Sequence, residues 1–148
     1  MRIRVRLVLF ARDVAEKAFL SLPRRTNALD AARAMRESHQ GFVVVSEGGL
    51  PEGIVTEWDY LSKVVADGRD PGSVSLGDIM TPGLITVQGS EGLESVARKM
   101  TERGVRRVLV LQDGKALGVI TSRTILARLE EYVDRVSTTI ARLQAPPY

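Results

Sequence analysis

Apolar and polar residues along the chain form two similar series of short apolar runs and amphipathic stretches. In each series one run ends in Gly-Ile-Val-Thr or Gly-Val-Ile-Thr, at residues 53–56 and 118–121, and a helical pattern follows directly. Short apolar runs bounded by turn residues are typical of buried strands. The pattern therefore predicts a strand that turns directly into a helix near Glu57, and the same unit again at Ser122.

The two series are related by a constant shift of 65 residues, the difference between Gly118 and Gly53. The shift pairs similar residues without a gap: Asp13 with Asp78, Leu20-Ser21-Leu22 with Ile85-Thr86-Val87, Arg33 with Arg98, Met35 with Met100, Val43-Val44-Val45 with Val108-Leu109-Val110, and Gly49 with Gly114. Two copies of one unit, each too small to bury its own apolar face well, are expected to pack on each other.

The periodicity and the turn residues give each copy the same expected elements. In the first copy these are one helical turn within 13–18, a strand over 19–22, a helix capped by Thr26 or Asn27 and ending near Ser38, strands over 42–46 and 51–56, and a helix to about Ala66. Residues 67–75 are the expected linker. The second copy is expected to have a turn over 76–80, a strand over 84–87, a helix over 90–103 and strands over 107–112 and 116–121.

The repeat resembles the cystathionine-β-synthase (CBS) domain, which usually occurs as a tandem pair called a Bateman module. The residues that carry the resemblance are Asp78-Ile79-Met80, Val108-Leu109-Val110, the turn at Asp113-Gly114, and Gly118-Val119-Ile120-Thr121. The resemblance covers about residues 12 to 130. It implies an α/β (α+β) fold of two β-α-β-β-α repeats packed with pseudo-twofold symmetry. The expected domains are a strand extension over 1–11, repeats over 12–70 and 75–130, and a helical extension over 131–148.

Length and composition fit a globular chain without cysteine chemistry. At 148 residues, 44% hydrophobic and 26% charged, the chain can form one domain, or two small ones that share a core. The absence of cysteine excludes disulfides and thiolate catalysis. No apolar run reaches the length that spans a membrane, and we expect a cytoplasmic protein.

The first ten residues alternate arginine with apolar residues, at Arg2, Arg4 and Arg6. This period predicts a strand with one basic face. Solvated arginines on an edge strand discourage edge pairing, which is the favoured interpretation. Contact with nucleic acid is the less favoured one, because aromatic residues are sparse and the basic run is brief.

The last helix continues beyond the repeat, with apolar residues spaced three and four apart at Leu126, Leu129, Val133, Val136, Ile140 and Leu143. This spacing is typical of a coiled-coil seam. The alternative is an amphipathic helix that lies on its own domain. Pairing with a second subunit is favoured, and a homodimer is therefore expected; Pro146-Pro147 ends the helix.

The sequence offers little for catalysis, and no enzyme activity is expected. The single histidine, His39, stands at the end of a predicted helix, and no metal-ligand cluster, nucleophile elbow or glycine-rich phosphate loop is present. Thr56 stands at the N-cap position, where its hydroxyl can serve the first free amides of a helix. Thr56, these amides and Asp59 together suit a ribose phosphate, although a capped helix with an acidic first turn has the same pattern.

The resemblance implies two ligand clefts between the repeats, each with the Thr and Asp of one copy. The first cleft would combine Thr56 and Asp59 with residues from the second copy: Met80, Ile85, Val105, Arg106 and Arg107. The apolar residues would enclose adenine, Asp59 would accept from the ribose hydroxyls, and the arginines would bind phosphate. Solvated arginines at a strand start are the alternative.

The second cleft would be built from Leu20, Phe42, Thr121 and Thr124 and departs from the family pattern. Thr124 replaces the ribose carboxylate, and Gly41 and Phe42 stand where Arg106 and Arg107 stand in the other copy. This cleft is expected to be empty or weaker, or to take a less charged adenosyl ligand.

Together these features predict a regulatory sensor that binds AMP, ADP, ATP or S-adenosylmethionine and needs no cofactor or metal. The protein that it regulates is unknown. A dimerisation module without a ligand is the alternative, and nucleic-acid binding is a third hypothesis.

Overall fold

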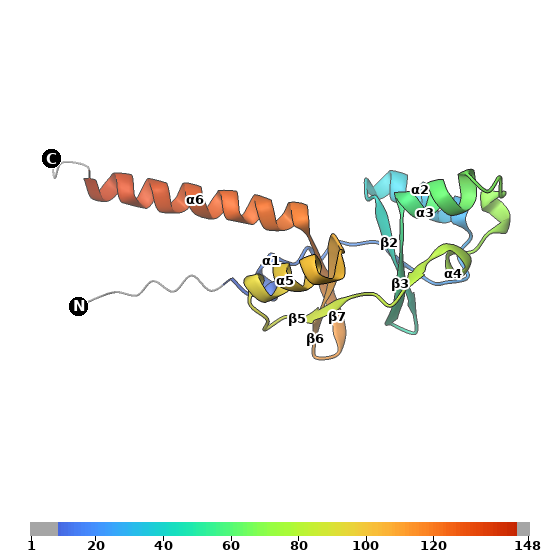
Figure 1. The fold of residues 1–148 in the computed structure, drawn as a ribbon, viewed down its shortest axis with the longest axis horizontal. Helices are drawn as coiled ribbons and strands as arrows, with labels where there is room; N and C mark the ends of the chain where they lie inside the picture. Colours follow the sequence, from blue (N-terminus) through green and yellow to red (C-terminus); the bar gives the residue numbers. More distant parts are fainter. Residues whose placement is uncertain (1–8, 145–148) are drawn as a thin grey trace.

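A computed structural model of the chain describes residues 9–144, which form two small lobes and one long helix (Figure 1). The first repeat contains α1 (Ala11–Val14), β1 (Ser21–Leu22), α2 (Ala28–Ser38), β2 (Phe42–Glu47), β3 (Leu50–Thr56) and α3 (Glu57–Tyr60), which continues as the π-helix η1 (Leu61–Val65). After the 3-10 turn η2 (Pro71–Ser73), the second repeat contains α4 (Leu76–Ile79), β4 (Thr81–Pro82), β5 (Thr86–Gln88), α5 (Leu93–Arg103), β6 (Arg107–Gln112), β7 (Lys115–Thr121) and α6 (Ser122–Gln144).

These bounds confirm the predicted order of elements, with shorter first strands than expected. Only Ser21–Leu22 and Thr86–Gln88 pair as strands, because the residues before them cross between the lobes. Asn27, and not Thr26, caps α2 by accepting a hydrogen bond from the Asp30 amide. The predicted basic strand lies mostly outside the described residues; within them Phe10 forms a single bridge with Gly92.

The shift of 65 residues holds in the hydrogen-bond register of the two sheets. The first sheet has the order β1-β2-β3-β4 and the second the order β5-β6-β7. Ser21 pairs in parallel with Val44, and its counterpart Thr86 pairs with Leu109. Both antiparallel hairpins carry a bulge at the same place, after Val45 and after Val110. The backbone is therefore duplicated in detail.

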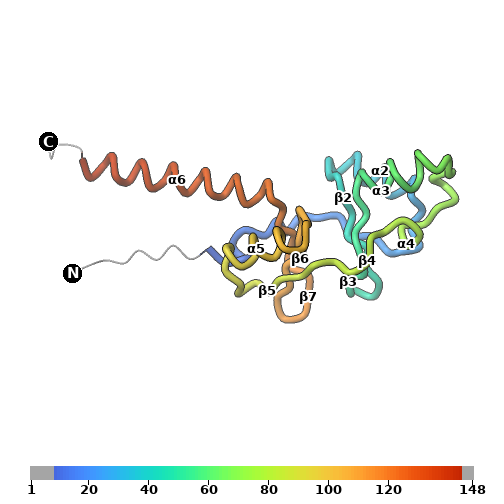
Figure 2. The backbone as a smooth tube through the Cα atoms, viewed as in Figure 1, coloured from blue at the N-terminus to red at the C-terminus, as the bar shows by residue number. Residues whose placement is uncertain are grey.

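The segment that begins each repeat packs in the lobe of the other repeat. Helix α1 contributes Ala11 and Val14 to a core with α5 and β5–β7, and α4 contributes Leu76 and Ile79 to the core beneath α2. Figure 2 shows these crossed positions, with α4 beside α2 and α3. The pairing is crossed in the same way, since Thr81 pairs with Ile54 and Glu16 with Val119. Each lobe is therefore completed by the other repeat.

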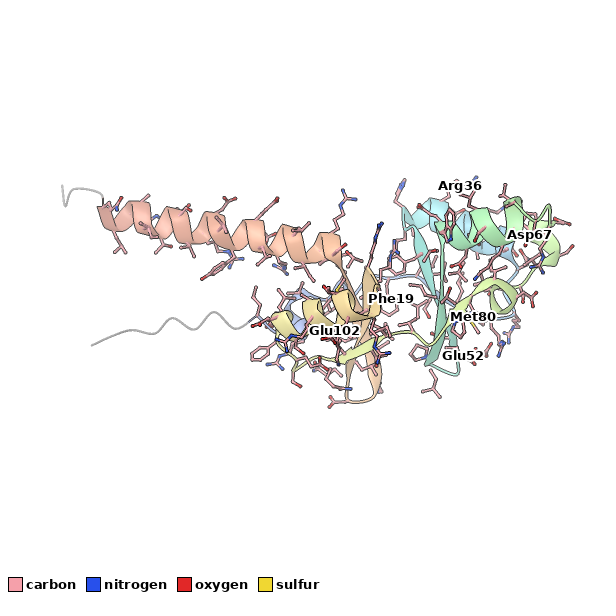
Figure 3. The ribbon with its side chains drawn as sticks, in the orientation of Figure 1. Phe19, Arg36, Glu52, Asp67, Met80 and Glu102 are labelled. Atoms are coloured by element: carbon pink, nitrogen blue, oxygen red, sulfur yellow. The ribbon has the colours of Figure 1, made fainter. Side chains whose placement is uncertain are left out.

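A third core joins the two sheets. Val44, Leu109 and Val119 are buried there, and Phe19, Phe42 and Leu84 pack against them. Figure 3 shows Phe19 at the junction of the lobes. Both predicted clefts lie along this junction.

Helix α6 extends away from the lobes, and none of its residues is buried (Figure 1). Its exposed large apolar residues are the predicted seam: Leu126, Leu129, Val133, Val136, Ile140 and Leu143. The alternative of a helix lying on its own domain is therefore wrong. The predicted stop at residues 146–147 falls outside the described residues. Over residues 9–144 no helix has the length and apolarity needed to cross a membrane.

Candidate functional site

The first cleft has a volume of about 300 Å³ and takes its walls from both repeats. Five of the seven residues predicted for it lie in these walls: Thr56, Ile85, Val105, Arg106 and Arg107. Val44, Ile54 and Leu109 form much of the remaining wall, which makes the cleft mainly apolar. Sequence reasoning missed Thr81 and Leu84, which stand in the crossing segment just before Ile85.

Asp59 does not line the first cleft, contrary to expectation, because residues of both repeats within the first lobe enclose it. The residue is 4% exposed, and its carboxylate accepts from the Thr56 amide at 2.8 Å and from the Thr56 hydroxyl at 3.2 Å. Lys63 Nζ lies 2.8 Å from the other carboxylate oxygen, Oδ1, and the Thr81 hydroxyl donates to the same oxygen at 3.4 Å. A buried carboxylate needs such partners to offset the loss of water.

This arrangement also changes the role of the Thr56 hydroxyl. It was expected to accept from the first helical amides, but it donates to Asp59. Lys63 connects the cluster to the second repeat, since its Nζ also donates to the Ile79 carbonyl at 2.8 Å. The i,i+4 spacing of Asp59 and Lys63 is a sequence signal that could have predicted the ion pair.

Met80 is the other residue that the structure places outside the wall of the first cleft. It packs against the core of the first lobe (Figure 3). Its sulfur lies 3.0 Å from the point where a Cβ on Gly53 would stand, so the absence of a side chain at residue 53 makes room for it.

The second cleft is larger, about 570 Å³, and more polar. Of its predicted residues, Phe42, Thr121 and Thr124 line it, whereas Leu20 packs against the first core. In place of the contact between a hydroxyl and a carboxylate in the first repeat, the Thr121 and Thr124 hydroxyl oxygens lie 2.8 Å apart, and the Thr121 hydroxyl accepts from the Thr124 amide.

The expectation that this cleft lacks cations is wrong. Arg106 and Arg107 line both clefts, and Arg123 lines the second. Arg123 stands at the position of Trp58 in the first repeat, since 123 − 58 is 65. A residue-by-residue comparison of the helix starts would have found it.

Arg107 is directed across the junction toward the first repeat. Its guanidinium carbon lies 5.2 Å from the centre of the Phe42 ring, within the range of a cation–π contact. Its Nε is buried and has no hydrogen-bond partner in the described part of the chain. Phe42 lines the second cleft, so this contact lies on that side, while Arg107 also lines the first cleft.

His39 ends α2 in a left-handed conformation, φ 53°, and is exposed, as expected for a helix-end histidine. It also lines the second cleft. Within residues 9–144 no group of three or more histidine, aspartate and glutamate side chains is placed to hold a metal ion.

Two crossed repeats with clefts at their junction define a class of paired α/β modules. The CBS domain model matches residues 11–66 and 76–131, so the chain belongs to the CBS domain family and contains two such domains. An uncharacterized protein of Methanopyrus kandleri is 35% identical over 123 residues. The match covers 82% of this chain and 62% of that protein, so the chain spans less than two thirds of that relative.

Solved structures agree with the fold. The hexameric CBS-CP12 protein from bloom-forming cyanobacteria is 30% identical, with a TM-score of 0.74 over 81% of this chain and 67% of that one. The CBS domain pair solved in complex with 5′-methylthioadenosine and S-adenosyl-L-methionine also has a TM-score of 0.74, over 84% of this chain and 98% of that one. At 23% identity, that second likeness concerns the fold alone.

Proposed function

We propose that the chain is a regulatory module that binds an adenosyl ligand in the first cleft and catalyses no reaction. The observation that carries the proposal is the composition of the cleft wall. Apolar Ile54, Ile85 and Val105 come from both repeats and suit an adenine ring, and the Thr56 hydroxyl, which donates to Asp59, lies beside them as an acceptor. A CBS domain pair of the same fold binds 5′-methylthioadenosine and S-adenosylmethionine.

The mechanism is a shift of a conformational equilibrium. A ligand held between Val44 and Ile54 of one repeat and Ile85 and Val105 of the other favours the arrangement in which both walls are close. Arg106 and Arg107 add phosphate contacts for AMP, ADP or ATP. The regulated partner would bind one arrangement of the repeats more tightly than the other.

A ligand screen tests this proposal. Thermal unfolding is measured with 5′-methylthioadenosine, S-adenosylmethionine, AMP, ADP and ATP. A ligand at 100 times its Kd should stabilise the fold by about 2.7 kcal/mol. The variant Val105→Trp, which fills the cleft, should lose the shift, whereas Leu50→Trp at an exposed hairpin end should keep it. If none of the five ligands shifts the transition, a dimerisation module without a ligand becomes the better hypothesis.

We also propose that the chain forms a homodimer through α6. The exposure of the six apolar residues of its seam to water would be unfavourable in a monomer. The seam residues alternate between the two core positions of a heptad: the a positions are Leu126, Val133 and Ile140, and the d positions are Leu129, Val136 and Leu143. Two of the three a residues are β-branched and two of the three d residues are leucine. This combination favours a parallel two-stranded coiled coil. Trp58, Leu61 and Val65, exposed on α3 and η1, offer a second apolar stripe. A monomer mass by light scattering at micromolar concentration would contradict the dimer.

A further inference from the structure

We propose that Lys63 is a conformational switch that holds one wall of the first cleft in place and lets this wall open when its contacts are released. The wall is formed by the crossing segment, residues 79–85, in which the chain passes from the first lobe to the second (Figure 2). The opening itself needs no ligand. Its use in controlling access to the first cleft rests on the proposed function.

The contacts of Lys63 join the two repeats where the crossing segment begins. Lys63 Nζ lies 2.8 Å from Asp59 Oδ1 and also donates to the Ile79 carbonyl at 2.8 Å. The Thr81 hydroxyl donates to the same carboxylate oxygen at 3.4 Å. We call these three contacts the Lys63 link. An ammonium and a carboxylate of the first repeat thus hold residues 79 and 81 of the second.

Apart from the Lys63 link, the crossing segment depends on a very short strand. Strand β4 has two residues, Thr81 and Pro82, both exposed at the edge of the first sheet. Proline has no N–H group, so Pro82 donates no hydrogen bond to β3. Residues 81–85 nevertheless all line the first cleft. A short, exposed strand opens more easily than the sheet beside it, and the Lys63 link therefore decides where this wall stands.

The two charges of the Lys63 link differ in their access to water. The side chain of Lys63 is 39% exposed, whereas that of Asp59 is 6% exposed. Rotation of the lysine side chain can return its ammonium to water, where it is solvated without a partner. Asp59 then keeps the amide and the hydroxyl of Thr56 as hydrogen-bond donors. Release of the link therefore costs less free energy than the loss of one partner from a fully buried pair.

The helix that carries Lys63 has two forms available to it. Residues 61–65 form the π-helix η1, in which the Ala66 amide donates to the Leu61 carbonyl at 2.9 Å. π-Helices are rare and occur mostly as single turns at functional sites. The equivalent residues of the second repeat, 126–130, are α-helical. Release of Lys63 allows residues 61–65 to take the α form, which moves the exposed Leu61 and Val65 together with the cleft wall.

The second repeat lacks the switch because it lacks the buried acid. Arg128, the counterpart of Lys63, donates to the Asp13 carbonyl at 3.3 Å and pairs with Glu131 at 3.1 Å. Glu131 is exposed, and an ion pair at the surface contributes little to stability. Thr124 stands at the position of Asp59. Arg128 is therefore the matched control for Lys63.

Thiol labelling of the full chain without ligand tests the proposal, because the chain has no cysteine of its own. Ile79→Cys places a thiol at the start of the crossing segment, and Val43→Cys places one on β2 in the same core; both parent side chains are fully buried. Lys63→Met should raise the rate at which dithiobis-nitrobenzoate labels residue 79 at least about tenfold, because charge-assisted contacts are lost. The rate at residue 43 should not change, and Arg128→Met should change neither rate.

A second variant protects the test against a folding defect in Lys63→Met. Thr81→Val keeps the ion pair and removes one contact of the link, so it should raise the labelling rate at residue 79 by a smaller factor. The proposal is overturned if Lys63→Met raises the rates at residues 79 and 43 equally, since Lys63 would then stabilise the whole lobe. It is also overturned if neither Lys63→Met nor Thr81→Val changes the rate at residue 79.

The switch and the proposed function can fail separately. Labelling of residue 79 that depends on Lys63, in a chain to which no adenosyl ligand binds, would contradict the proposed function and support the switch. Binding of an adenosyl ligand to a chain in which labelling does not depend on Lys63 would support the proposed function and overturn the switch.

Discussion

The two helix starts have the same backbone and different chemistry. Thr56 and Thr121 end equivalent strands and begin equivalent helices. In the first repeat the turn that follows encloses an ion pair between Asp59 and Lys63, whereas in the second Thr124 replaces the acid. Arg128, the counterpart of Lys63, donates to the Asp13 carbonyl as Lys63 donates to that of Ile79. Duplication has thus kept a hydrogen bond between this helix and the short helix that begins a repeat, and it has changed the residue at the position of Asp59.

The largest difference between the two helix starts is expected when the buried carboxylate of Asp59 is removed. Asp59→Ala should lower the free energy of unfolding by about 3 kcal/mol, because it leaves the Thr56 amide and Lys63 without their shared partner. Thr124→Ala removes only a contact between hydroxyls and should cost less than about 1 kcal/mol. Urea denaturation of both variants measures the difference. Equal losses would show that the two turns are energetically alike.

The helices that follow the two turns differ in length, which offers the second test. The first ends at Val65, and α6 continues to Gln144. Val133→Glu with Ile140→Glu should raise the dimer dissociation constant at least about 100-fold, since each apolar side chain contributes about 1.5 to 3 kcal/mol when buried. Thr138→Glu, on the opposite side of the helix, is the control and should leave the dimer intact. Sedimentation equilibrium distinguishes the two; a dimer that survives the double change would exclude the seam as its interface.

Arg107 lines both clefts, and its removal tests whether it contributes to ligand binding in the first one. Arg107→Ala should weaken ATP and AMP binding about tenfold and spare adenosine, because in the proposed function its guanidinium would contact the phosphate group and not the nucleoside. Arg103→Ala, at the exposed end of α5, lines neither cleft and should change neither affinity. Titration calorimetry with ATP, AMP and adenosine measures these affinities. Equal losses for ATP and adenosine would mean that Arg107 shapes the cleft and does not contact phosphate.

The smallest expected effect concerns Tyr60, whose counterpart is Ile125. The Tyr60 hydroxyl donates to the Ala28 carbonyl at 2.7 Å, and Tyr60→Phe should cost about 1 kcal/mol. Burial raises the pKa of Tyr60 from 10.0 to about 12. The folded state therefore holds the phenolic proton more tightly than the unfolded state does, and this contribution is lost as pH rises from 10 to 12. Tyr60→Phe should flatten the stability profile in that window, and Tyr132→Phe on α6 is the control.

The sequence was sufficient to predict the backbone because the 65-residue shift constrains both copies at once. The strands over 107–112 and 116–121, the helix over 28–38 and the exposed seam all follow from local patterns, and the structure confirms them within a few residues. The resemblance to the CBS domain also implies one cleft with Thr56, Ile85 and Val105 in its walls, and the structure has all three there.

Side-chain direction could not be predicted in the same way. Arg107 belongs by alignment to the first cleft, but its long side chain reaches the Phe42 ring at the second. Asp59 belongs to the family pattern, but the lysine one turn later and Thr81 from the other repeat occupy its carboxylate. Alignment between repeats fixes where a Cα stands, and it says nothing about which of several partners a charged side chain chooses.

The crossed packing of α1 and α4 has a consequence for the origin of such a chain. Each half carries the segment that fills the other half's core, so half a chain has an open core and a free segment of matching shape. Two separate copies of one ancestral repeat would each fill the open core of the other by exchanging these segments. Joining them through residues 67–75 turns an encounter between two molecules into one within a single molecule, with an effective concentration set by a short tether. Gene fusion would thus preserve an exchange that began between partners, and each copy could then change its cleft while the other kept the pair assembled.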